Sequence, residues 1–158
     1  MRGYKHERSL RIGRHSQQGN LYLVTSVLKD RAPLFSEIQI GRLEVKEMRR
    51  LHDTGVVHSL AWVVMPDHLH WLFELKSGSL AALMQALKGR TAFEVNKAHG
   101  AKKMTWQKGY HDHGVRADED LVEMARYVIN NPIRAGLVTH RGDYPLWDCE
   151  WMLGWDCL

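Results

Sequence analysis

The stretch VVHSLAWVVMPDHLHWLFEL, residues 56–75, decides the fold. It holds two apolar runs, 56–65 and 68–75, that are rich in β-branched and aromatic residues. Such runs are typical of buried strands, and the Met-Pro-Asp of residues 65–67 is short enough for a hairpin turn. The stretch therefore predicts two neighbouring antiparallel strands.

The second of these strands begins with His68 and His70 on either side of Leu69. Residues i and i+2 of a strand point to the same face, so the two imidazoles stand side by side while Leu69 faces the core. Imidazole is the commonest metal ligand in proteins. The pair is therefore either a metal site or two polar residues on a solvated face.

The flanking segments before this stretch predict one strand and one helix. Residues 20–28 are apolar and rich in β-branched side chains, as in a buried strand. Ser36 and the acidic Glu37 provide a cap for a helix that runs to about Asp53 and ends near Gly55.

The segments after the stretch complete the layout. Apolar residues at helical spacing predict a second helix: Leu80, Leu83, Met84 and Leu87. Residues 104–116 suit a strand followed by a loop, and the acidic residues 118–120 open a third helix that ends at about Asn131, before Pro132. The order β-α-β-β-α-β-α predicts an α+β, ferredoxin-like (split βαβ) domain: an antiparallel sheet with helices on one face and a C-terminal helix. That fold hosts many functions.

Length and composition are those of a globular protein. The 158 residues suit one domain, and 44% hydrophobic and 25% charged residues are ordinary. A net charge of +4 permits nucleic acid, an anionic membrane surface or an acidic ligand as partner. The two cysteines form no CxxC motif, which argues against a disulfide framework or a zinc ribbon. With no signal peptide or membrane span in the sequence, we expect a cytoplasmic protein.

Two terminal segments stand apart from this domain. Residues 1–19 form a basic arm with a cation at every third position up to Arg14, which is either solvated or in contact with nucleic acid. Residues 20–158 make a single catalytic domain that ends in a tail containing Trp147, Trp151 and Trp155. These indoles either pack onto the domain or offer stacking surfaces.

The third helix carries a candidate nucleophile. Tyr127, Asn131 and Arg134 are spaced i, i+4 and i+7, so they share one flank of that helix. A phenol has an ordinary pKa of about 10 and needs a strongly electrophilic target to attack at neutral pH. A metal ion on His68 and His70 would polarise a phosphoryl group as a Lewis acid. The amide oxygen of Asn131 could complete such a site, and these ligand types tolerate zinc, manganese or other divalent ions.

Several motifs together resemble a known family. They are YLVT with DRAPLF, AWVVMPDHLHWLFEL, WQKGYHDHGVR, DEDLVEMARYVINNPIRAGLV and YPLW, in that order between residues 13 and 147. The chain resembles the REP-associated tyrosine transposases, a branch of the single-tyrosine HUH (His-hydrophobe-His) endonucleases.

The resemblance implies a role for each matching residue. His68 and His70 would be the HUH metal ligands, Tyr127 the catalytic nucleophile and Asn131 the third ligand. Such enzymes use Mg²⁺ or Mn²⁺ to cleave single-stranded DNA, leave a 5′-phosphotyrosyl link and a free 3′-OH, and rejoin strands by the reverse step. The targets of this branch are palindromic repeats folded as hairpins. In mobile relatives two subunits exchange tyrosine helices, so monomer and homodimer both stay open.

Further residues are candidates for DNA contact, each with a structural alternative. His113 and Arg116 either bind phosphate or hydrogen-bond within a loop; His111 with His113 could also form a rival metal pair. Trp106 either stacks on an unpaired base or belongs to the core. The basic candidates either line a DNA groove or are plain solvated charges: Arg14, Lys88, Arg90 and Arg134.

Three functions are compatible with these residues. The first is the metal-dependent nickase and strand transferase. The second is a catalytically silent repeat-DNA-binding protein of the same fold, which would bind DNA without Tyr127 and form no adduct. The third is a metal phosphohydrolase that activates water with the two histidines and does not need Tyr127.

Overall fold

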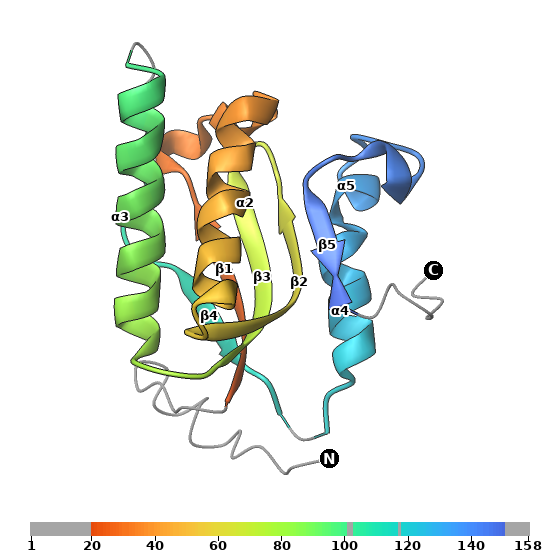
Figure 1. The fold of residues 1–158 in the computed structure, drawn as a ribbon. Helices are drawn as coiled ribbons and strands as arrows, with labels where there is room; N and C mark the ends of the chain where they lie inside the picture. The colour runs from red at the N-terminus through yellow and green to blue at the C-terminus, as the bar shows by residue number, and fades with distance from the viewer. Residues whose placement is uncertain (1–19, 101–102, 117, 151–158) are drawn as a thin grey trace.

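The computed structural model describes residues 20–100, 103–116 and 118–150 (Figure 1). The predicted basic arm, 1–19, lies outside the described residues, as do Arg14, Trp151 and Trp155.

The core of the fold is a five-stranded antiparallel sheet with strand order β4-β1-β3-β2-β5. Its strands are β1 Leu21–Val27, β2 Val57–Val64, β3 His68–Leu75, β4 His111–Gly114 and β5 Trp147–Cys149. The order of the first four strands is that of a split βαβ unit, so the predicted ferredoxin-like fold is confirmed. The predicted hairpin is also present, because β2 and β3 pair directly across residues 65–67.

Helices cover both faces of this sheet (Figure 1). Helix α2, Ile38–Asp53, and helix α3, Leu80–Ala98, bury their apolar stripes against Leu69, Trp71 and Phe73 of β3. Helix α4, Leu121–Ile129, packs on the opposite face, where Ala125 and Val128 meet Leu72. The C-terminal helix is thus on the same face as the alternate residues of β3, His68 and His70.

The starts of two elements differ from the prediction. Ser36 lies in a 3₁₀ turn, Leu34–Ser36, and its hydroxyl donates to the carbonyl of Pro33, so it does not cap α2. Strand β4 starts only at His111; before it, Trp106 forms an isolated bridge with Leu28. The GYHDHG segment, expected as a loop, is therefore largely strand, because its backbone completes the free edge of β1.

The end of α4 also differs from the prediction. The helix stops at Ile129, and Asn131–Arg134 forms a separate short helix, α5. Pro132 has no N–H to continue the hydrogen-bond ladder of α4, which explains the break. Strand β5 was not predicted; it follows two further 3₁₀ turns of the fold, Lys29–Arg31 near the N-terminus and Arg141–Asp143 just before it.

None of the helices in the described part of the chain is both long and apolar enough to cross a membrane.

Candidate active site

Sheet register places the two histidines on the face covered by α4. Thr25 of β1 lies between His70 on one neighbouring strand and His111 on the other. Directly opposed residues of antiparallel strands share a face, so His111, Thr25 and His70 form a row across the sheet. His68 is one pleat further along the same face, opposite Val27.

The two imidazoles are held in place by oxygen partners. Their ring centroids are 4.8 Å apart, with the rings nearly perpendicular. His68 Nδ1 lies 2.6 Å from Oδ1 of Asp67, and His70 Nδ1 lies 2.8 Å from Oγ1 of Thr25. When each Nδ1–H donates to its oxygen, each Nε2 keeps its lone pair for a metal.

Electrostatics favour the neutral form that a metal ligand needs. Burial, and then the neighbouring His68 and Arg134, lower the pKa of His70 to about 4, so its imidazole is uncharged at neutral pH. Burial alone would raise the pKa of Asp67, but hydrogen bonds from His68 and Arg31 lower it overall. The Arg31 guanidinium is 3.1 Å from Oδ2 of Asp67. The carboxylate is therefore ionised and oriented towards His68.

Tyr127 stands beside this pair on α4. Asp120 caps the helix by accepting from the N–H groups of Val122 and Glu123, and Ala125 and Val128 face the sheet. Tyr127 consequently lies on the flank of α4; its side chain is 52% exposed, and its ring centroid is 6.3 Å from that of His70. An accessible phenol thus lies next to two oriented imidazoles.

Arg134 holds Tyr127 from the other side. Its guanidinium carbon is 4.0 Å from the centroid of the phenol ring, and its Nη2 donates to the Tyr127 carbonyl at 2.6 Å. The predicted neighbourhood of these two residues is present, although they belong to two helices rather than one. The stack fixes the ring with a permanent cation beside it.

Asn131 is the first residue of α5 and is half-buried. Among the described residues its side-chain amide has no hydrogen-bond partner, whereas the amide oxygen of its neighbour Asn130 accepts from Arg141. Over the described ranges, no group of three or more His, Cys, Asp or Glu side chains is placed to hold a metal. A two-histidine site would therefore take its further ligands from an amide such as Asn131, from water or from substrate oxygens.

His113 and Arg116 meet at a structural contact. The Nε2 of His113 is 2.8 and 3.0 Å from the carboxylate oxygens of Glu119, which also accepts from the Arg116 N–H at 2.8 Å. His111 and His113 do share a strand face, contrary to the loop expectation, but the His113 imidazole is engaged with Glu119. Their roles in DNA or metal binding stay predictions.

The other predicted DNA contacts also have structural partners. Lys88 Nζ donates to the carbonyls of Gln107 and Gly109 at 3.0 and 2.7 Å. The indole N–H of Trp106 donates to the Lys88 carbonyl, and its ring packs on Phe35, which is the core alternative. The Nε of Arg90 is 3.2 Å from a Glu47 carboxylate oxygen. Contact of these residues with DNA remains a prediction.

Two residues of the site were missed from the sequence. Asp67 directly precedes His68, and a carboxylate beside a candidate metal ligand is a signal that could have been used. Thr25 is 45 residues from His70, and nothing local connects the two. Only the strand register brings them together.

The solved structures that resemble this fold are transposases. A REP-associated tyrosine transposase bound to a REP hairpin matches with a TM-score of 0.69 at 22% identity, covering 93% of this chain and 82% of that one. A transposase-like protein from Deinococcus radiodurans matches with a TM-score of 0.54 at 20% identity, covering 70% and 88%. At these identities the likeness shows the fold.

Sequence relatives agree with the motif resemblance. A Haemophilus influenzae protein named as a REP-associated tyrosine transposase is 27% identical over 143 residues, covering 81% of this chain and 78% of its own length. The REP-associated tyrosine transposase of Escherichia coli is 29% identical over 87 residues, covering 54% and 50%. The similarity to REP-associated tyrosine transposases is thereby confirmed. Residues 17–131, most of the chain, match the family model described as transposase IS200 like, and the chain belongs to that family.

Proposed function

We propose that this protein is a metal-dependent, single-stranded DNA endonuclease and strand transferase that acts on palindromic repeat hairpins. The observation that carries the proposal is the meeting of an accessible Tyr127 with the oriented pair His68 and His70 on one face of the sheet. The hairpin substrate is inferred from relatives, one of which is a REP-associated tyrosine transposase bound to a REP hairpin.

His68 and His70 would hold Mg²⁺ or Mn²⁺ through Nε2, with Asn131 as a third ligand. The donor set fits, because both Nδ1 atoms are engaged by Asp67 and Thr25 and the pKa of His70 is lowered to about 4. A metal bound there supplies Lewis-acid polarisation of a phosphoryl oxygen and orients the scissile bond.

In the proposed cleavage step, the phenol oxygen of Tyr127 attacks the scissile phosphorus. A bond forms from that oxygen to phosphorus, the bond from phosphorus to the 3′ oxygen breaks, and the phenol proton passes to solvent while the leaving oxygen takes up a proton. The products are a 5′-phosphotyrosyl link and a free 3′-OH. Attack by a 3′-OH on the phosphotyrosyl link reverses the step and rejoins strands. Arg134 keeps the ring in place through its stack and its bond to the Tyr127 carbonyl.

Labelled single-stranded hairpin repeats from the source genome, incubated with Mn²⁺ or with EDTA, test this proposal. We expect a covalent protein–DNA band on denaturing gels with Mn²⁺, absent with EDTA and absent in Tyr127→Phe. Tyr110→Phe is the matched control, because it removes a phenol outside α4, and it should form the adduct.

Two outcomes would refute the proposal. Tight hairpin binding with neither adduct nor cleavage would indicate the catalytically silent binding protein. Cleavage without an adduct, retained in Tyr127→Phe, would indicate the phosphohydrolase.

A further inference from the structure

A groove runs between helix α2 and strand β5. Two hollows of about 230 and 380 Å³ share Val45, Arg49, Trp62 and Asp148 in their linings, so they are continuous. The groove lies outside the candidate active site, and its lining residues have no role in the catalytic proposal.

The groove opens on the sheet face opposite the two histidines. Trp62 pairs across the sheet with Trp71, which is buried beneath α2, whereas the next residue, Val63, pairs with His70. Because successive residues of a strand alternate faces, Trp62 and His70 point to opposite sides. Ligand in this groove would therefore not compete with ligand at Tyr127.

One wall of the groove is a row of unpaired cations. Arg42, Lys46 and Arg49 line it from α2, and all three side chains are exposed. Within the described part of the chain none of them has an ion-pair or side-chain hydrogen-bond partner, whereas Arg50, on the next flank, binds Glu47. At 1.5 Å per residue, the row extends about 10 Å along the helix axis.

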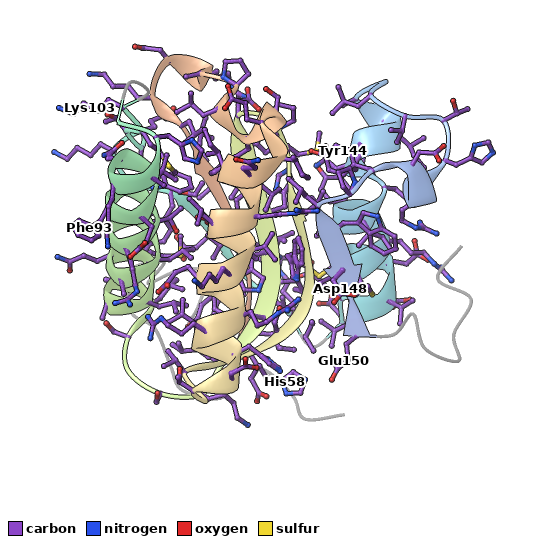
Figure 2. All side chains as sticks on the ribbon, turned by 45° about the horizontal axis from the view of Figure 1, so that its top comes forward. His58, Phe93, Lys103, Tyr144, Asp148 and Glu150 are labelled. Atoms are coloured by element: carbon purple, nitrogen blue, oxygen red, sulfur yellow. The ribbon has the colours of Figure 1, made fainter. Side chains whose placement is uncertain are left out.

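The opposite wall offers little negative charge to neutralise this row. Figure 2 shows Asp148 and Glu150 along β5, with His58 near the lower end of the same gap. Glu150 is already paired, at 2.6 Å from Nε2 of His58. Only the carboxylate of Asp148 remains to oppose three cations, and the half-buried Trp62 adds an aromatic surface to the lining.

We propose that this groove binds a single-stranded segment of nucleic acid, with phosphates on Arg42, Lys46 and Arg49 and a base stacked on Trp62. A row of point charges beside an aromatic ring suits a strand whose phosphates and unpaired bases are both accessible. A length of about 10 Å accommodates two to three consecutive phosphates. The proposal rests on the proposed function in taking DNA as the ligand, and it adds a second contact surface.

The groove has a short path to the candidate active site. The Val64 N–H donates to the Leu146 carbonyl at 2.9 Å, and the Tyr144 hydroxyl donates to the Val64 carbonyl at 2.6 Å. These bonds fix the end of the groove near Leu146 beside the hairpin that leads to His68. A DNA strand leaving one face at this end of the sheet can continue onto the other.

Salt-dependent binding of oligo(dT) of roughly 30 nucleotides, in EDTA to prevent cleavage, tests the groove. Each lost phosphate contact on a single strand lowers the slope of log K against log salt by about 0.7, so Arg42→Gln with Arg49→Gln should lower it by about 1.4. Arg42→Lys with Arg49→Lys keeps both charges and should keep the parent slope. Lys97→Gln with Lys103→Gln, which removes two charges elsewhere, should change it less.

Photocross-linking locates the base. Oligo(dT) carrying 5-iodo-deoxyuridine should cross-link to Trp62, identified by mass spectrometry of peptides. A parent-like slope in the Arg42→Gln, Arg49→Gln variant, a slope lowered equally in the Lys97→Gln, Lys103→Gln variant, or cross-links that never include Trp62 would overturn the groove. Perturbation of the Trp62 indole NMR signal by poly-glutamate but not by oligo(dT) would indicate an acidic protein segment instead.

The catalytic proposal and the groove fail separately. A Tyr127 adduct together with an unaltered salt slope in the Arg42→Gln, Arg49→Gln variant overturns only the groove. A lowered slope and a Trp62 cross-link without any Tyr127 adduct overturn only the nickase. Absence of all DNA binding by the parent protein overturns both.

Discussion

Replacing Thr25 by valine removes a single oxygen from beneath the candidate metal site and leaves the side-chain volume nearly unchanged. Its Oγ1 lies 2.8 Å from Nδ1 of His70, so Thr25→Val leaves a partly buried N–H without an acceptor. Such an unsatisfied group costs about 1–3 kcal/mol. Loss of an oxygen partner behind a metal-ligating histidine lowers metal affinity by about 10–100-fold, or roughly 1.4–2.7 kcal/mol. The two magnitudes agree.

Mn²⁺ titration followed by paramagnetic broadening of the histidine ring signals measures this affinity without any DNA. We expect Thr25→Val to weaken Mn²⁺ binding by about 10–100-fold and to shift His70 from the Nδ1–H tautomer towards Nε2–H. Ser26→Ala is the matched control, because Ser26 is the next residue of β1, its hydroxyl points to the opposite face, and that hydroxyl has no hydrogen-bond partner among the described residues. Parent-like Mn²⁺ affinity in Thr25→Val, or an equal loss in Ser26→Ala, would refute the positioning role.

Three further predictions concern the nucleophile and the core. Arg134→Gln should slow adduct formation by about 2–10-fold in single-turnover assays, because the stack on the Tyr127 ring is lost; an unchanged rate would contradict it. Burial raises the pKa of Glu44 from 4.5 to about 8, so the folded protein keeps a proton that the unfolded chain releases, and stability falls as pH rises from 4.5 to about 8. Urea unfolding across that range should show the fall flattened in Glu44→Gln, and an equally steep fall would be evidence against it. Trp71→Phe should lower the free energy of unfolding by about 1–3 kcal/mol, since Ser59 Oγ loses its indole donor; a smaller change than in a Ser59→Ala variant would contradict this.

The sequence predicted the elements well because their signals are local. The hairpin at residues 65–67 and the strand that carries His68 follow from alternation and turn chemistry within 20 residues. The split βαβ order then fixed which strands are neighbours. Strand β5 escaped prediction because it has only three residues, Trp147–Cys149, and pairs with β2 through a contact between distant segments.

The candidate site was predictable in its members but not in its supports. The spacing of Tyr127 and Arg134 suggested a shared flank, and the two residues are stacked, even though Pro132 divides their helices. The partners of the histidines depend on pairing between strands, which a single sequence does not encode locally. The role of Thr25 could be seen only once β1 was paired with β3.

The alternation of β2 and β3 explains how one thin sheet separates two tasks. On β3, His68 and His70 face α4 and Tyr127, while Leu69 and Trp71 between and beside them fill the core under α2. On β2, the same alternation turns Trp62 away from the histidines and into the groove. A one-residue shift in register would exchange every one of these side chains between faces, so the buried Leu69 and Trp71, which the core holds on one side, also hold the histidines on the other.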